Sequence, residues 1–157
     1  MEINRVWNDK VRKTADHPKK EKIKVIVDSN ALFVPLQLKI DIFDGLKTLL
    51  NRNFELVLLS PIKKELEKLA TEGSPKTRRE ATYALKLAEK CTIVDLNEVF
   101  GGDPDEAIVK VAGEWKCPVF TNDRELRKRL RDISVPVIYV RQKSRLEIDG
   151  ECEPCSN

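Results

Sequence analysis

Residues 22–32, with the sequence KIKVIVDSNAL, decide the fold. The largely apolar, β-branched run at 23–27 ends abruptly at Asp28, Ser29 and Asn30. A run of this kind predicts a central strand of a parallel sheet, buried on both faces. Asp28 then lies at the carboxyl end of that strand, where open α/β sheets place their ligands. We therefore take Asp28 as the first candidate site residue.

Strand and helix patterns alternate along the rest of the chain. Further strands are expected at 54–59, 92–96, 118–120 and 135–140, and one more strand is an option after residue 141. Helices are expected at 40–50, 60–72, 76–90, 104–113 and 124–131, the second of them capped by Ser60. The alternation predicts an α/β fold, a three-layer α/β/α sandwich around a five-stranded parallel sheet.

The 157 residues are enough for one domain. We expect an N-terminal extension at 1–22, a single domain at 23–149 and a C-terminal tail at 150–157. The extension is polar and mixed in charge, so we favour a packing arm over an anchor to RNA or to a protein.

Composition narrows the function only slightly. Charged residues make up 35% of the chain and the net charge is +3, so the surface is mixed and favours a polyanionic partner weakly. The sequence has no run of 18 apolar residues and no apolar segment behind its N-terminal charges. We therefore expect neither a membrane span nor a secretory signal, and a cytoplasmic location.

The cysteines give one weak motif. Cys152 and Cys155 form CEPC, which has the spacing of half a zinc site. Cys91, Cys117 or His17 would have to complete it. Cys91 and Cys117 each stand at the start of an expected strand, where a small buried apolar side chain is the simpler interpretation. We favour a free cysteine pair over a zinc site.

Two further carboxylates lie on helix faces that should turn inward. Glu65 falls three residues after Ile62 and four before Leu69, at the edge of an apolar stripe. Asp105 precedes Ile108 by three residues and likewise leads a buried stripe. Each acid also has a plain structural interpretation, because Asp105 suits a helix N-terminus and Glu65 can reach water.

Four carboxylates are thus expected at one edge of one sheet. Asp28 and Asp123 follow strands, and Glu65 and Asp105 lie on helices that follow strands. Asp103 is an additional nearby acid that could join or replace Asp105 as a metal ligand. Asp28 and Asp123 could each simply cap the helix that follows. Two carboxylates about 5 Å apart repel by about 3 kcal/mol at an effective dielectric constant of 20. A cluster of four therefore calls for a cation, and oxygen ligands select Mg²⁺ or Mn²⁺.

Such a site can activate water and shield a phosphodiester during in-line hydrolysis. Other mechanisms are excluded or disfavoured by composition. His17 is the single histidine, which rules out a two-histidine ribonuclease and disfavours a Ser, His, Asp triad. No phosphate-binding P-loop sequence and no GxGxxG motif is present.

The segments VIVDSNAL, SPIKKELEKLA, GDPDEAIVKVA and VFTNDRELRKRL resemble, in this order, the four acidic signatures of the PIN-domain ribonucleases. The resemblance implies Asp28, Glu65, Asp105 and Asp123 around the metal, with RNA as substrate. It implies supporting roles for a second set of residues: Ser29, Asn30, Thr121 and Asn122.

Within the family, TNDRELRKRL and the later YVRQKSRL look most similar to the archaeal and eukaryotic branch that processes rRNA. VapC-type toxins share the same core but are usually shorter at the N-terminus, so the extension favours RNA processing. The resemblance implies RNA, a pre-ribosomal particle or an antitoxin as partners, and a homodimer is an option.

Two other classes of function remain open from the sequence. One is a non-catalytic PIN-like module that binds RNA or protein, which the complete set of acids disfavours. The other is a phosphohydrolase of the haloacid dehalogenase type. That class needs a second Asp two residues after the nucleophile, and Asn30 occupies the position here.

Overall fold

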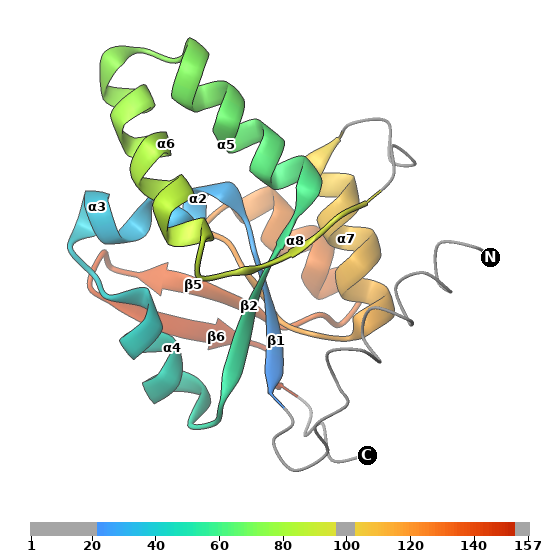
Figure 1. Cartoon of the computed structure of the whole chain (residues 1–157). Helices are drawn as coiled ribbons and strands as arrows, with labels where there is room; N and C mark the ends of the chain where they lie inside the picture. The colour runs from blue at the N-terminus through green and yellow to red at the C-terminus, as the bar shows by residue number, and fades with distance from the viewer. Residues whose placement is uncertain (1–21, 97–102, 153–157) are drawn as a thin grey trace.

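The computed structural model describes residues 22–96 and 103–152, which form one mixed sheet covered by helices (Figure 1). The order of the strands in the sheet is β3-β2-β1-β4-β5-β6. Their bounds are β1 Ile23–Val27, β2 Phe54–Leu59, β3 Thr92–Val94, β4 Val119–Phe120, β5 Val137–Arg141 and β6 Arg145–Asp149. The α/β class and the layered architecture expected from the sequence are confirmed.

Strand β1 is central, as its apolar run predicts. It pairs in parallel with β2 on one side, where Val25 lies beside Leu56, and with β4 on the other, where Val27 lies beside Phe120. Four of its five side chains are buried. Since β4 is the other strand that flanks β1, the ends of β1 and β4 bring Asp28 beside Thr121.

The sheet has a sixth strand beyond the five predicted, in the region after residue 141 where one more strand was an option. β6 pairs antiparallel with β5, with Arg141 opposite Arg145. The turn between them uses Gln142 and Lys143 in the left-handed conformation, at φ +53° and +56°. A connection this short can join only antiparallel neighbours. Such turns usually carry Asn or Gly, and this one carries neither, so the sequence gives little sign of a hairpin.

The helices form the outer layers of the sandwich (Figure 1). α4 packs against β2 and β6, whereas α8 packs against β5 and contacts α7. The α5–α6 pair is an antiparallel hairpin that extends from the upper end of the sheet in Figure 1. The bounds are α2 Ser29–Leu32, α3 Val34–Leu38, α4 Ile42–Leu50, α5 Ser60–Glu72, α6 Pro75–Ala88, α7 Pro104–Trp115 and α8 Arg124–Asp132.

The predicted cap at the start of α5 is wrong. Leu59 is the N-cap and Ser60 is already the first helical residue. The buried Ser60 hydroxyl instead accepts a hydrogen bond from the Leu96 backbone N–H at 2.8 Å and donates to the Leu96 carbonyl at 3.4 Å. It therefore ties the segment after β3 to α5, a long-range contact that local sequence cannot reveal.

Replacing Ser60 by Ala should leave the buried Leu96 N–H without its partner. We expect the free energy of unfolding to fall by about 1–3 kcal/mol. The matched control is Ser74→Ala, which removes a true N-cap hydroxyl that accepts from Thr77 N at 3.2 Å in an exposed position. We expect it to cost about 1 kcal/mol. Urea unfolding of both variants checks the ranking, and an equal or smaller loss for Ser60→Ala would contradict it.

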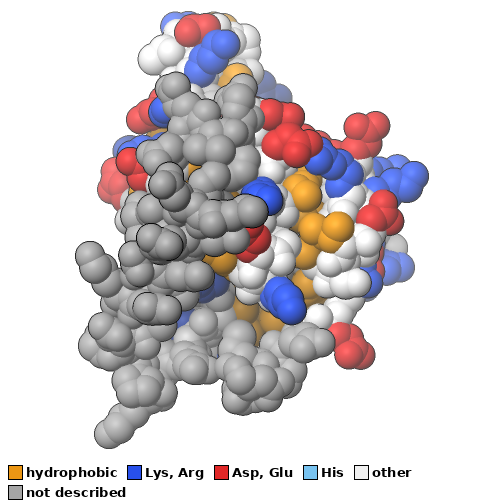
Figure 2. Space-filling model, turned by 90° about the vertical axis from the view of Figure 1, so that its right-hand side faces the viewer, with side chains coloured by type: hydrophobic (Ala, Val, Ile, Leu, Met, Phe, Trp, Pro, Cys, Tyr) orange, Lys and Arg blue, Asp and Glu red, His pale blue; other side chains and the backbone are white. Residues whose placement is uncertain are grey.

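The surface carries both signs of charge. On the face that carries α7, acidic and basic side chains alternate around a strip of apolar atoms (Figure 2). No helix in the described ranges is long and apolar enough to cross a membrane. Because charges of both signs are mixed on this face, a strong preference for an anionic ligand would require a local cluster of Lys or Arg side chains.

Candidate functional site

Asp28 is the most buried carboxylate that the structure describes, with 5% of its surface exposed. Its Oδ1 accepts a hydrogen bond from the backbone N–H of Ser29 at 2.8 Å, so it caps the short helix α2. Its Oδ2 accepts from the Thr121 hydroxyl at 2.7 Å and from Asn30 Nδ2 at 3.1 Å. The capping interpretation is therefore correct but incomplete, because a simple cap needs neither the burial nor the two added donors.

The polar residues after β1 and β4 form one network. Thr121 is fully buried, and its hydroxyl oxygen also accepts from Asp123 N at 3.1 Å. Asn30 Oδ1 accepts from Asn122 N at 3.0 Å, and Asn122 Oδ1 accepts from Val140 N at 2.8 Å. Three neighbouring strand ends are thus held together by side chains, which fixes the position of the Asp28 carboxylate.

The remaining candidate acids come from three helices around Asp28. Glu65 is half-buried on α5, beside the buried Ile62 and Leu66. Asp105 is half-buried in the first turn of α7. Asp123 is the N-cap of α8 and accepts from the backbone N–H groups of residues 125 and 126. α5 contacts both α2 and α7, so these helix ends meet at the carboxyl edge of the sheet.

Electrostatic repulsion links Asp28 with each of the other three candidate acids. Burial raises the pKa of Asp28 above its ordinary value of 3.8, and repulsion from Glu65 and Asp123 raises it further. Hydrogen bonds from Thr121 and Ser29 oppose this shift. Burial also raises the pKa of Asp105, and repulsion from Asp28, Asp123 and Asp103 acts in the same direction.

The acids are close enough to repel, yet they are not drawn together. Among the described residues, no three Asp, Glu, His or Cys side chains are arranged as a ready metal site. The donor set nevertheless fits a hard divalent cation, because it offers carboxylate oxygens whose ionised forms are disfavoured by burial and by one another. A cation would reverse both penalties.

Two further acids near this edge, Asp103 and Glu106, make contacts that stabilise α7 and α8. Asp103 is the exposed N-cap of α7 and accepts from Asp105 N at 3.1 Å. Glu106 is ion-paired with Arg129 of α8. Of the three acids in the GDPDE segment, Asp105 is the one whose raised pKa includes repulsion from Asp28.

Two of the cysteines named as possible zinc ligands, Cys91 and Cys117, lie within the described residues. Cys117 is buried and Cys91 is half-buried, and burial raises the pKa of the Cys91 thiol to about 11. Both observations fit an apolar role. His17, Cys155 and residues 1–21 lie outside the described residues.

One feature of the edge was not singled out from the sequence. A hollow of about 370 Å³ adjoins the network at Thr121 and Asn122 and is lined with cations from α8 and the β5–β6 turn. The available signal was Arg124, a cation in the first turn of a helix, where the helix dipole disfavours it.

Replacing Thr121 by Val should raise the pKa of Asp28 further, because a donor to the ionised carboxylate is lost. A carboxylate with a raised folded-state pKa costs stability as pH rises above its unfolded-state value. The loss of stability caused by Thr121→Val should therefore grow from pH 3 to pH 7, reaching about 1–3 kcal/mol. Titration of the Asp28 carboxyl carbon by NMR and urea unfolding at both pH values check this. Thr121→Ser keeps the hydroxyl and is the control, and a pH-independent loss would contradict the expectation.

Comparison with known proteins identifies the relatives of the chain. A family model described as a PIN like domain matches residues 25–143. Ribonuclease VapC4 of Methanocaldococcus jannaschii is 38% identical over 128 residues, covering 81% of this chain and 97% of the relative. The rRNA-processing protein fcf1 of Schizosaccharomyces pombe is 33% identical over 127 residues, covering 78% of this chain and 62% of fcf1.

Solved structures agree with the sequence comparison. The PIN domain endonuclease Utp24 matches with a TM-score of 0.67 and 29% identity, covering 83% of this chain and 93% of Utp24. The match of the family model spans β1 to the β5–β6 turn, and therefore includes all four candidate acids. This chain belongs to the PIN-like domain family.

Proposed function

We propose that this chain is a cytoplasmic endoribonuclease that hydrolyses RNA phosphodiester bonds with Mg²⁺ or Mn²⁺ held by Asp28, Glu65, Asp105 and Asp123. The observation that carries the proposal is Asp28. It is a buried carboxylate at the end of the central strand, whose ionised form is disfavoured by burial and by two further acids. Without a cation such an arrangement only costs stability, so a metal site is its best explanation.

The surrounding residues would orient the acids. Ser29, Asn30 and Thr121 together place three donors on the Asp28 carboxylate, which fixes its direction before any ligand arrives. Asn122 links this group to β5 through Val140 N. A bound divalent ion would lower the pKa of a water molecule and shield the phosphodiester. The chain itself contributes the partly buried carboxyl edge of the sheet, where these hydrogen bonds hold the Asp28 carboxylate in a fixed orientation.

For the substrate we propose a ribosomal RNA precursor. The support is the similarity to fcf1, whose name states rRNA processing, and to the endonuclease Utp24. We assign the nuclease to residues 23–149, with residues 1–22 as an added arm and residues 150–157 as a tail. The chain would then bind a pre-ribosomal particle. Self-association as a homodimer is compatible with this function.

A VapC-type toxin is the second candidate. It is favoured by 38% identity to VapC4 across 97% of that relative. The two functions differ in what cleavage does to a cell. Induced expression of a toxin arrests growth, and an antitoxin partner relieves the arrest, whereas a processing enzyme leaves growth intact. Growth of an inducible expression strain, compared with an Asp28→Asn strain, separates them.

Metal binding can be measured without any reaction. Since a ligand that binds only the folded state stabilises it, Mn²⁺ at 100 times its dissociation constant should raise the free energy of unfolding by about 2.7 kcal/mol. Wild-type protein should show this shift and cleave single-stranded RNA to products with 5′-phosphate ends, and EDTA should remove both effects. Thermal melts in calcium-free buffer measure the stabilisation by Mn²⁺, and cleavage of end-labelled RNA measures the products. Cleavage that continues in EDTA would contradict the proposal.

A further inference from the structure

A pocket of about 370 Å³ lies beside the acidic edge and is built mainly by α8, β5 and the β5–β6 turn. We name it the cationic pocket because four of its lining residues carry a positive charge: Arg124, Arg127, Arg141 and Lys143. No carboxylate from the described parts of the chain lines it. It shares Thr121 and Asn122 with the network around Asp28, so its mouth and the acids belong to one continuous edge.

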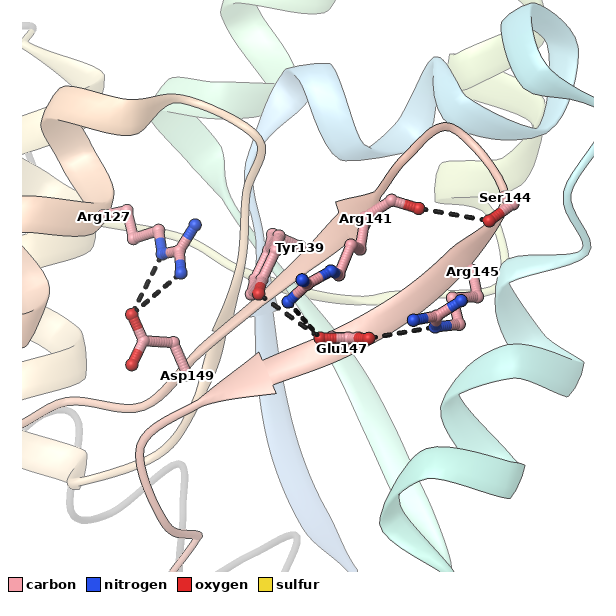
Figure 3. Close-up of polar contacts among 7 residues, drawn as sticks. All are labelled: Arg127, Tyr139, Arg141, Ser144, Arg145, Glu147 and Asp149. Atoms are coloured by element: carbon pink, nitrogen blue, oxygen red, sulfur yellow. Dashed lines mark hydrogen bonds and ion pairs between the residues drawn. The ribbon is translucent and has the colours of Figure 1, made fainter.

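Two of its lining residues, Arg127 and Tyr139, form a guanidinium–aromatic pair (Figure 3). The Arg127 guanidinium lies 3.8 Å from the centre of the Tyr139 ring. Asp149 fixes it there, with Oδ2 at 3.1 Å from Nε and 3.0 Å from one terminal nitrogen. Glu147 of β6 holds Arg141 at 3.2 Å and also accepts from the Tyr139 hydroxyl at 3.5 Å. Both flat groups are therefore oriented in advance, at little cost to a ligand.

The other two cations are placed against local preference. Arg124 is the first helical residue of α8, where the positive end of the helix dipole disfavours a cation. Lys143 has φ +56°, a left-handed conformation that disfavours side chains and usually selects Gly or Asn. Neither is ion-paired to a carboxylate among the residues that the structure describes. Departures from local preference are expected at functional or strained positions.

We propose that the cationic pocket holds one unpaired nucleotide of the RNA strand beside the cleaved bond, with its phosphate on Arg124 and Lys143 and its base against the Arg127–Tyr139 pair. The inference rests on the proposed nuclease function and adds the substrate subsite to it. The volume falls within the roughly 300–1,000 Å³ typical of small-ligand sites. Stacking on aromatic and guanidinium planes is how proteins bind unpaired bases regardless of sequence.

Charge alone would also suit an acidic segment of a partner protein. RNA is favoured by the joint presence of unpaired cations and a preformed flat surface, because a carboxylate peptide needs only the cations. The position of the pocket agrees, since Thr121 and Asn122 place it directly beside the carboxylates proposed to cleave the strand. The phosphates of an RNA strand that approaches the acidic edge are repelled by the carboxylates there, and the cations of the pocket offset this repulsion.

The test measures binding of fluorescein-labelled ten-nucleotide oligouridine to the full chain by anisotropy in EDTA, where no cleavage interferes. Lys143→Gly removes the cation and also relieves the left-handed backbone, so weakened binding cannot be blamed on unfolding. Lys116→Gly is the matched control, because Lys116 is exposed, has φ +54° and caps the far end of α7. Arg124→Gln removes the second cation and its conflict with the helix dipole.

We expect Lys143→Gly and Arg124→Gln each to weaken RNA binding about 5- to 10-fold and to lower the salt dependence by about 0.7 per lost phosphate contact. Lys116→Gly should change neither. Tyr139→Leu should weaken binding about 10-fold, and Tyr139→Phe, which keeps the ring, should not. Thermal melts of all variants should match or exceed the wild type, except for Tyr139→Leu.

Binding by Lys143→Gly and Arg124→Gln as tight as that of Lys116→Gly would overturn the inference. So would a polyglutamate peptide that binds more tightly than RNA and loses affinity in the same variants, since the pocket would then serve an acidic protein. The nuclease proposal fails separately, by absence of cleavage in Mn²⁺. The subsite stands if the binding pattern holds even then.

Discussion

Asp28→Asn is expected to reduce RNA cleavage by at least about 1,000-fold, because it removes a charged ligand from the proposed metal site. The shape of the side chain is kept, and an amide oxygen can still accept the hydrogen bond that Thr121 donates. The variant should therefore remain folded. Single-turnover cleavage of end-labelled RNA in saturating Mn²⁺ measures the loss, and circular dichroism checks the fold.

The same variant makes a prediction about pH in the absence of metal. The folded-state pKa of Asp28 is raised, mainly by burial, so the native wild type holds its proton more tightly than the unfolded chain does. Its stability is thus lost as pH rises from the ordinary value of 3.8 through the folded-state pKa. Asn has no such dependence. The difference in unfolding free energy between Asp28→Asn and wild type should shift in favour of the variant between pH 3 and pH 7.

Asp41→Asn is the matched control for the cleavage measurement. Asp41 also caps a helix, accepting from the backbone N–H groups of Phe43 and Asp44 at 3.0 and 3.1 Å, but it is exposed. Asn caps nearly as well as Asp, so cleavage should not change appreciably. Cleavage by Asp28→Asn at the level of Asp41→Asn would remove the basis for the proposed metal site.

The elements that carry the acids were predictable because short-range patterns determine them. An apolar run ending in Asp28 gave the central strand, and the spacing of Ile62 and Leu66 placed Glu65 at the edge of a buried face. Both patterns follow from burial and periodicity alone. The nearness of Asp28 to the residues that follow β4 is a consequence of the parallel pairing of β1 and β4.

Features that depend on distant partners were not predictable. The Ser60 hydroxyl bonds to Leu96, 36 residues away, in place of the expected cap. The optional strand after residue 141 is present as β6, but its antiparallel pairing with β5 was not predicted, because the turn between them carries neither Gly nor Asn. The Arg127–Tyr139 contact joins a helix to a strand. In each case the partner is set by tertiary packing, which local propensity does not encode.

The choice between Asp103 and Asp105 was open from the sequence and now has an electrostatic basis. Asp105 is partly buried, and repulsion from Asp28 and Asp123 contributes to its raised pKa. Asp103 is exposed, and its carboxylate accepts from Asp105 N as the cap of α7. A ligand must face the other acids, whereas a cap must face its own helix. We therefore expect Asp105 to bind the metal, and Asp103 to hold Asp105 in place by capping α7.

Replacing each acid by Asn separates these roles. Asp105→Asn should lower kcat/KM about 100-fold at limiting Mn²⁺ and recover partly as Mn²⁺ is raised, because one of several ligands is lost and affinity falls first. Asp103→Asn should stay within about 2-fold of wild type, since Asn also caps helices well. Cleavage rates across a Mn²⁺ titration, with thermal melts as the check on folding, make the comparison. A larger loss in Asp103→Asn would transfer the ligand role to Asp103, because an exposed cap has no other reason to change the requirement for metal.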